Sequence, residues 1–217
     1  MNRSAILPTA RRFRAEPYYF CFAVGKLSLD PAYPHTARLL ASSPRPLLDI
    51  GCGMGLLAAY LRHCGHQPSI VGLDIDAEKV TFAQGLLGND NARFIKADGL
   101  DLPEHEGDVV MLDVLHYFND EDQQLLLEKI VARLAPGGTA LIRVTLREKS
   151  WRFALSQFEE EFIRVVRWIP VLGSNFPTKE EILAPFEKAG IECHVQPMWG
   201  RTPFNSYLFT LQKPAAS

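Results

Sequence analysis

The sequence has few cysteines, and their positions follow no pattern typical of disulfide frameworks or zinc sites. The four cysteines are Cys21, Cys52, Cys64 and Cys193. We interpret them as reduced thiols of a cytoplasmic protein. His63 and His66 flank Cys64, but no carboxylate and no second Cys/His cluster completes a ligand set, so we predict no bound metal.

Long hydrophobic runs and an excess of charge are also missing. No segment approaches the ~20 apolar residues that cross a bilayer. The basic start of the chain is not followed by the apolar core of a signal peptide. A formal charge of -2 and a pI near 6.3 give no general attraction to polyanions. We therefore expect a soluble protein with no membrane span and no nucleic-acid partner.

What is present favours one α/β domain. Hydrophobic residues make up 47% of the 217 positions, which is enough to bury a full core. From Leu47 onward, short apolar runs alternate with segments of helical period, as in a parallel sheet covered by helices. The predicted strands are 46–50, 69–74, 92–98, 108–113 and 139–146. Four of the five end at or beside an aspartate, where open α/β sheets bind their ligands.

Helical segments at 54–65, 76–88 and 120–138 are predicted as crossovers between these strands. The first puts a set of residues on one face and ends at Gly65. That set is Leu56, Leu57, Tyr60, Leu61 and Cys64.

After Leu146 the pattern changes. An aromatic helical stripe is predicted over 150–168, followed by a loop, as an insertion over the site. Thr178 and Glu181 have capping-box spacing at the start of a helix, and Pro185 predicts a bend or boundary within it. Segments 191–198 and 205–212 are predicted as strands that pair antiparallel at the sheet edge.

The central motif is the glycine-rich segment LLDIGCGMG, between a predicted strand and a predicted helix. It contains Asp49, Gly51, Cys52, Gly53 and Gly55. Glycines let the backbone approach a ligand, and the helix start supplies N–H groups. Leu56 stands where a dinucleotide motif needs its last glycine. Because Asp49 would repel phosphate but tolerate a cationic group, the motif favours a phosphate-free nucleoside over a simple tight turn.

Three further positions complete the predicted nucleoside site. Asp74 ends the second strand at the right distance to bind ribose hydroxyls, and its alternative role as helix N-cap suits Asp76 better. Ile75 is placed to pack on adenine. Asp98 and Gly99 are predicted to meet the adenine edge, against the alternative of an ordinary turn pair.

Taken together, these segments resemble the class I S-adenosylmethionine-dependent methyltransferase family. The resemblance rests on LLDIGCGMG, VGLDID, FIKADGLDLP, DVVMLDVLHYF and LAPGGTALIRV, in order and with family-like spacing from Leu47 to Val144. It implies S-adenosylmethionine as cofactor and a seven-stranded sheet whose last strand is antiparallel. It also implies that the methionine end binds at the glycine turn and after Asp113. Residues before Leu47 and 147–176 carry no named motif, so the acceptor stays unassigned.

For the acceptor, the candidates are fewer and the alternatives remain open. His116 is the predicted general base, against a buried histidine beside the site. Asp113 is predicted to orient the methionine ammonium or the acceptor, against a charge at a helix start. Tyr117 is either a pocket wall or core. Tyr18 and Tyr19 belong to an aromatic N-terminal segment, which is either a helical cap over the acceptor or a helix packed on the sheet.

We therefore expect an α/β, Rossmann-like, doubly wound and mostly parallel seven-stranded sheet with an antiparallel last strand. Within a single domain, we expect a helical cap at 1–45, a cofactor-binding core at 46–146, a helical lid at 147–176 and a closing helix with two edge strands at 177–217. The predicted function is methyl transfer to an O, N or activated C atom of a small aromatic or acyl-derived metabolite, free or carrier-bound. The alternatives are an NAD-dependent oxidoreductase and a non-catalytic nucleoside-binding module.

Overall fold

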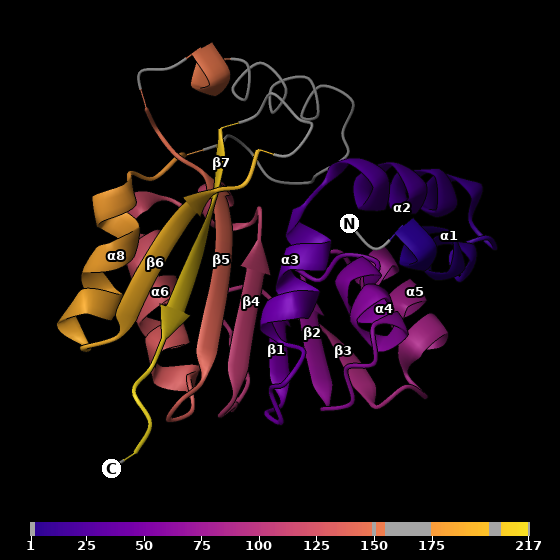
Figure 1. Cartoon of the computed structure of the whole chain (residues 1–217), viewed down its shortest axis with the longest axis horizontal. Coiled ribbons are helices and arrows are strands. Elements are labelled where there is room, and N and C mark those ends of the chain that lie inside the picture. Colours follow the sequence, from indigo (N-terminus) through magenta and orange to yellow (C-terminus); the bar gives the residue numbers. More distant parts are fainter. Residues whose placement is uncertain (1–2, 149–150, 155–174, 200–204, 217) are drawn as a thin grey trace. The chain divides into compact units, whose positions relative to one another are not determined.

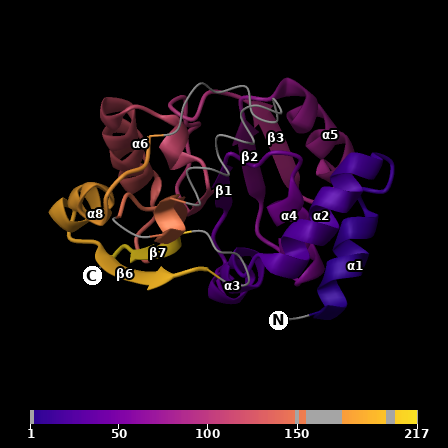
Figure 2. The same cartoon turned by 90° about the horizontal axis from the view of Figure 1, so that it is seen from above.

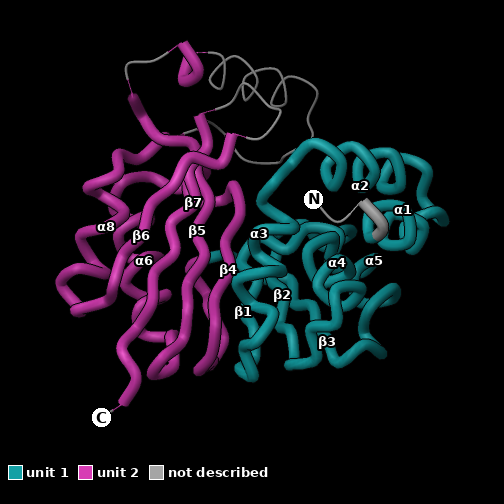
Figure 3. Tube along the Cα trace, viewed as in Figure 1, with its two compact units in different colours: residues 1–99 teal, residues 100–217 magenta. Residues whose placement is uncertain are grey.

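A computed structural model describes residues 3–148, 151–154, 175–199 and 205–216 of the chain. They form two compact units, residues 1–99 and residues 100–217 (Figure 3). Each unit is described by itself. Within the described residues, no helix is both long and apolar enough to cross a membrane.

The first unit combines a three-stranded parallel sheet with five helices (Figure 1). The strands are β1 (Leu47–Ile50), β2 (Ile70–Asp74) and β3 (Ala92–Lys96). Leu48 pairs with Val71 and Val71 with Arg93, so β2 lies between β1 and β3. The helices are α1 (Arg3–Arg11), α2 (Pro17–Leu29), α3 (Ala32–Leu39), α4 (Leu56–His63) and α5 (Ala77–Leu87). The predicted strands are therefore confirmed, although β3 stops two residues before Asp98.

Helix α4 is buried almost all round, which the sequence pattern did not predict. Every residue from Leu56 to Leu61 is buried, because α1 and α3 both contact α4. In Figures 1 and 2 the N-terminal helices lie beside α4. Cys64 was predicted on the same face as Tyr60, and the hydrogen bond between their side chains confirms this. Cys64 is the C-cap residue and is exposed, and Gly65 follows with a φ of 90°.

The second unit holds a mixed sheet of four strands with helices. Its strands are β4 (Asp108–Leu112), β5 (Thr139–Thr145), β6 (Glu192–Pro197) and β7 (Ser206–Gln212). Strand β5 is parallel to β4, and β7 is antiparallel to both β5 and β6. Its helices include η1 (Leu115–Tyr117), α6 (Asp120–Arg133) and α8 (Lys179–Lys188), and residues 151–154 are also helical.

The strand order of the whole sheet is β3-β2-β1-β4-β5-β7-β6. Seven strands, most of them parallel, with β7 running antiparallel, confirm the predicted fold class. The predicted domain division stays a prediction. The aromatic stripe of Phe158, Phe162, Val165 and Val166 and its following loop lie outside the described residues, apart from the end of that loop.

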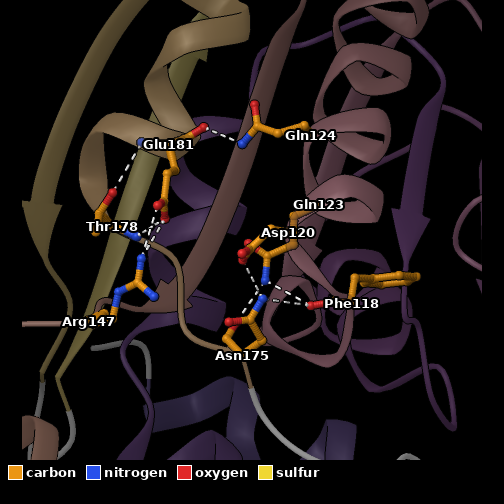
Figure 4. A network of polar contacts seen from close by, with 8 residues as sticks. All are labelled: Phe118, Asp120, Gln123, Gln124, Arg147, Asn175, Thr178 and Glu181. Atoms are coloured by element: carbon orange, nitrogen blue, oxygen red, sulfur yellow. Dashed lines mark hydrogen bonds and ion pairs between the residues drawn. The ribbon is translucent and has the colours of Figure 1, made fainter.

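Pro185 lies inside α8 and does not end it, so the predicted boundary there is wrong. Proline has no N–H, and the carbonyl of Glu181, four residues earlier, therefore loses its usual helical donor. Gln124 of α6 supplies a donor instead, with its Nε2 atom 2.9 Å from that carbonyl oxygen (Figure 4). The capping box of Thr178 and Glu181 is confirmed and fixes the start of the same helix.

The role of Gln124 as the replacement hydrogen-bond donor can be tested. We expect Gln124→Ala to lower the free energy of unfolding by about 1 kcal/mol in the natural chain, because it removes the only replacement donor that the described contacts show. In a Pro185→Ala background the backbone N–H returns, so the same change should cost clearly less. Urea unfolding of the four proteins in a double-mutant cycle measures the difference, and equal costs in both backgrounds would contradict the interpretation.

Candidate functional site

The glycine turn after β1 is held in place by backbone hydrogen bonds to β2. The N–H groups of Gly51 and Cys52 donate to the carbonyl oxygen of Leu73 at 2.8 and 3.0 Å. The N–H group of Gly55 donates to the carbonyl of Cys52 at 3.0 Å, which closes the turn before α4 begins. The turn is thus fixed by the end of β2, where Asp74 lies.

The three glycines of the turn are in the left-handed region, but their roles differ. Their φ values are 76° at Gly51, 53° at Gly53 and 80° at Gly55, conformations that residues with a Cβ atom rarely adopt. A Cβ atom at Gly53 would meet nothing within 4 Å. At Gly55 it would lie 2.9 Å from Cδ1 of Leu87. Gly53 therefore borders open space, whereas Gly55 is required by packing against α5.

Asp74 points at the glycine turn. Its Oδ2 atom accepts the N–H group of Gly53 at 2.8 Å, and its Oδ1 atom accepts the N–H group of Asp76 at 2.9 Å. Asp76 itself caps α5 by accepting from the N–H groups of Glu78 and Lys79. The expectation that Asp76 is the N-cap is confirmed, so the Asp74 carboxylate is available for another role.

Asp49 is the buried acid of the turn. Its side chain is only 3% exposed, and its Oδ2 atom has no hydrogen-bond partner among the described residues. Burial, followed by the negative charge of Asp74, raises the pKa of Asp49 to about 7. Burial also raises the pKa of the neighbouring Cys52 thiol, with a further contribution from the charges of Asp49 and Asp74. The turn therefore disfavours additional negative charge and favours a cation.

The raised pKa of Asp49 predicts a pH dependence of stability. Between its usual pKa of 3.8 and about 7, the folded protein holds a proton that the unfolded chain has released, so stability falls as the pH rises through this window and levels off above it. Asp49→Asn cannot ionise and should remove this contribution. We expect its stability advantage over the natural chain to grow by at most about 1 kcal/mol per pH unit from about pH 5 to 7. Urea unfolding at several pH values measures it, and a constant difference would be contrary evidence.

The residues predicted to contact adenine lie just after the ends of β2 and β3. Ile75, directly after β2, is 50% exposed despite its apolar side chain. The N–H group of Ala97 donates to the carbonyl of Asp74 at 3.1 Å, so Asp98 and Gly99 leave the end of β3 beside the end of β2. Asp98 is exposed and Gly99 is half-buried. Unit 1 thus brings together Asp49, the glycines, Asp74 and the ends of β2 and β3.

In the second unit, Asp113 has a partner that the sequence did not reveal. Its carboxylate lies 2.7 Å from Nη2 of Arg143 on β5, and Arg143 is only 7% exposed. The N–H group of Asp113 also donates to the carbonyl of Arg143, and Asp113 has a φ of 60°. The signal in the sequence was a lone arginine inside the apolar strand TALIRVT. The contacts described for Asp113 are with Arg143 of the same unit. Its predicted role in binding a ligand stays a prediction.

His116 is almost completely buried in η1. Its side chain is 2% exposed. Its ring stacks on Phe176 at a centroid distance of 5.4 Å and lies at a centroid distance of 4.2 Å from the half-buried ring of Tyr117. Its carbonyl accepts the N–H group of Asn175 at 2.7 Å. This burial favours the alternative of a histidine behind the site, and its role as a base stays a prediction.

A polar network attaches the segment before α8 to η1 and α6 (Figure 4). Asn175 donates from Nδ2 to Asp120, and its carbonyl accepts from Gln123, which also donates to the carbonyl of Phe118. Arg147 pairs with Glu181 at 3.0 Å. Phe176, which covers His116, is therefore placed by side chains that the sequence motifs did not include.

The predicted acceptor tyrosines lie on α2 in unit 1. Tyr18 is 55% exposed, whereas Tyr19 packs edge-on against Phe82 of α5 with ring centroids 4.8 Å apart. Phe13 is fully buried and stacks on the same Phe82 ring. The N-terminal segment is helical as predicted, and it packs on the helices of its own unit.

Comparisons with known proteins identify a methyltransferase domain in the chain. Residues 47–138 match the family described as methyltransferase domain. The chain is 30% identical over 156 residues to the ubiquinone biosynthesis O-methyltransferase of Nitrobacter winogradskyi. This match covers 67% of the chain and 56% of that protein, so the chain spans little more than half the length of this relative.

Two solved structures share the fold at low sequence identity. One is a chain of the complex between the Haloferax volcanii Trm112 methyltransferase activator and a methyltransferase, with a TM-score of 0.68, 20% identity and coverage of 96% and 95% of the two chains. The other is magnesium protoporphyrin IX methyltransferase from Synechocystis PCC 6803 with bound SAH, with a TM-score of 0.64, 17% identity and coverage of 84% and 81%. The domain match and the strand order lead to one conclusion: residues 47–138 are a methyltransferase domain, and the fold is the Rossmann-like fold of class I S-adenosylmethionine-dependent methyltransferases.

Proposed function

We propose that this chain transfers the methyl group of S-adenosylmethionine to an O, N or activated C atom of a small aromatic or acyl-derived molecule. The observation that carries the donor assignment is the position of Asp74 against the glycine turn. When bound, the donor supplies an electrophilic methyl group: the acceptor's lone pair forms the new bond while the sulfur keeps the electrons of the broken one, and the acceptor loses a proton where it has one to lose.

The residues of unit 1 fit this donor. A carboxylate offers about four acceptor positions, and the two described N–H groups occupy one on each oxygen of Asp74. One position on each oxygen is left for the two ribose hydroxyls. The open space at Gly53 allows a ligand to lie against the backbone, and the exposed Ile75 offers an apolar face for a base.

The electrostatics of the turn also fit a sulfonium better than a dinucleotide. The negative charge of Asp74 at the turn would oppose a pyrophosphate, and a pyrophosphate would further disfavour ionisation of the buried Asp49 beside it. The position of the last dinucleotide glycine is Leu56, which is buried at the first turn of α4. These features support methyl transfer over the NAD-dependent alternative.

A small acceptor is supported by the near-neutral net charge and by the aromatic side chains of α2, of which Tyr18 is exposed. Catalysis of such an in-line displacement depends mainly on alignment and on the exclusion of water. His116, Tyr117 and Asp113 remain our proposed acceptor-side residues.

Incubation of the protein with methyl-labelled S-adenosylmethionine and a fractionated cell extract tests the proposal. We expect label in a low-molecular-weight product. Label only in protein fractions, and not released by hydroxylamine as a carrier-bound acyl group would be, would overturn the proposed acceptor class. No transfer to any fraction would support the non-catalytic binding module. A calorimetric titration that shows no binding of the donor would overturn the whole proposal.

A further inference from the structure

Helix α2 has apolar side chains that packing within unit 1 does not use. Its buried side is formed by Ala23 and Leu27. Tyr19, four residues before Ala23, packs against Phe82 of α5. Residues four positions apart share one face of a helix, so these three positions form the packed side of α2. In an ordinary surface helix the opposite side is polar, because it faces water. In α2 the opposite side is apolar as well.

The exposed side of α2 forms a continuous apolar stripe, which we call the α2 stripe. Its positions follow the spacing i, i+3, i+4, i+7 and i+11, so they lie on one face along about 16 Å of helix. Tyr18 is 55% exposed and Leu29 is 50% exposed. A Cβ atom at Gly25 would meet nothing within 4 Å, so the middle of the stripe borders open space. The members are Tyr18, Cys21, Phe22, Gly25 and Leu29.

Exposed apolar side chains are concentrated in the N-terminal helices. In the described part of the chain, seven large hydrophobic side chains are exposed, and four of them belong to α1, α2 and α3. Single exposed apolar side chains are ordinary, whereas a group of them in one segment indicates an interaction surface. The four are Leu7, Tyr18, Leu29 and Leu39.

The same segment is basic, although the chain as a whole is acidic. Residues 1–40 contain six lysine and arginine residues and two acidic residues, a net charge of +4 in a chain whose total is -2. Of the two acids, Asp30 is 4% exposed and pairs with Lys26 at 3.1 Å, whereas Glu16 is exposed. Arg11 ends α1 and Arg14 precedes α2. Both are exposed, and neither has an acidic partner among the described residues.

Charge decides which partner fits this surface. A second copy of the chain would bring one +4 segment against another, and like charges across an interface repel. An acidic protein would have to present an apolar groove for the stripe, whereas an anionic bilayer supplies negative charge and apolar depth together. Helices that lie in such an interface combine an apolar face, aromatic side chains at the headgroup level and basic residues that meet the lipid phosphates.

We propose that α2 docks unit 1 onto a negatively charged lipid surface, with the α2 stripe in the interface and Arg11 and Arg14 at the headgroups. The helix lies on the bilayer and does not cross it, since it has 13 residues and a span needs about 20. The attachment does not depend on the proposed function, because it concerns the outer side of α2 and not the donor site.

Flotation of the full chain with lipid vesicles tests the attachment. The probe is vesicles of phosphatidylglycerol mixed with phosphatidylcholine, and vesicles of phosphatidylcholine alone are the comparison. We expect partition into the anionic vesicles to be stronger by about tenfold or more, since each arginine near a charged surface contributes about 1 kcal/mol, or roughly fivefold. Added salt should weaken this preference, because it screens the charges.

Alkylation of the cysteines shows where the vesicles contact the chain. Cys21 lies in the α2 stripe, Cys64 is the C-cap residue of α4, and both are exposed. Anionic vesicles should slow the labelling of Cys21 by about fivefold or more and change that of Cys64 by less than about twofold, because only Cys21 enters the interface. Mass spectrometry measures both rates in one sample. Equal protection of the two thiols would place the contact elsewhere and overturn the proposal.

Substitutions in the stripe test its apolar contribution. Phe22→Ser and Leu29→Ser should each weaken partition by about tenfold, because each removes one apolar side chain from the interface. Tyr18 is left unchanged, so that acceptor binding is not altered. The matched control is Leu125→Ser, which changes a leucine of α6 that is 42% exposed. It should change partition by less than about twofold. Urea unfolding of each variant verifies that it folds.

The charged residues give changes in opposite directions. Arg11→Gln combined with Arg14→Gln should weaken partition into anionic vesicles by about tenfold or more and leave binding to phosphatidylcholine unchanged. Glu16→Gln removes the exposed acid at the start of α2 and should strengthen partition into anionic vesicles. The same direction of change in both variants would contradict the electrostatic part of the proposal.

The remaining outcomes concern other occupants of the stripe. No partition into anionic vesicles would overturn the proposal, as would partition that survives both Phe22→Ser and Leu29→Ser. A dimer in light scattering that Leu29→Ser dissociates would show that a second copy covers the stripe, which also overturns it. Donor binding is measured separately by calorimetry, so failure of vesicle binding leaves the proposed function standing, and failure of donor binding leaves the lipid attachment standing.

Discussion

Asp74→Ala is expected to weaken binding of S-adenosylmethionine by about a hundredfold or more. Hydrogen bonds to a charged acceptor contribute about 1.5–3 kcal/mol each, and the remaining acceptor positions of Asp74 accommodate two ribose hydroxyls. Losing both corresponds to about 3 kcal/mol, or roughly two orders of magnitude in the dissociation constant. The variant also loses the bond to the N–H group of Gly53, so the turn becomes less well ordered. Calorimetric titration measures the change.

Asp90→Ala is the matched control for this variant. Asp90 is also an aspartate of unit 1, but its carboxylate pairs with Arg12 beyond the end of α5 and does not contact the glycine turn. Donor affinity should therefore stay within about twofold of that of the natural chain, since loss of a surface ion pair changes stability by at most about 1 kcal/mol. If both variants weaken the donor equally, Asp74 acts through stability of the unit and not through the ribose.

The donor side of the molecule was predictable because its signals are local. A strand, a glycine turn and a helix follow one another within 47–63, and each strand end carries its own acid. The pattern of strand, turn and helix repeats along the chain. Parallel strands joined by helices have their carboxyl ends at one edge of the sheet, so the fold could be predicted from this repetition. Asp74 and Asp76 could even be assigned separate roles, because a cap must directly precede its helix.

The remaining features depend on partners that are distant in the sequence. Arg143 pairs with Asp113 across 30 residues, and neither position indicates the other without the register of β4 and β5. Pro185 predicted a bend or a boundary, yet α8 continues through it and Gln124 of another helix donates to the carbonyl of Glu181. The sequence of α4 indicated one buried face, but α1 and α3 also contact this helix, so Ala58 and Ala59 outside that face are buried too.

Gly53 and Gly55 are expected to respond differently to substitution by alanine. Gly55→Ala is expected to lower the free energy of unfolding by about 3 kcal/mol or more, and Gly53→Ala by about 1 kcal/mol. Both positions have positive φ, so both substitutions carry backbone strain. Only at Gly55 does the new methyl group also meet Leu87 and Ala83, which are fully buried on α5 and have little room to move. Urea unfolding of the two variants measures this difference.

The order should reverse for ligand binding. A methyl group at Gly53 enters the open space where the donor is proposed to contact the backbone, so Gly53→Ala should weaken S-adenosylmethionine by tenfold or more although the fold is barely affected, because loss of about 1.4 kcal/mol of contact is tenfold in affinity. Comparing the two variants shows whether glycine is needed at each position for packing of the protein or for binding of the ligand. If Gly53→Ala binds the donor as the natural chain does, the space beside Gly53 is not the donor site, and the glycine turn is explained by packing and backbone geometry alone.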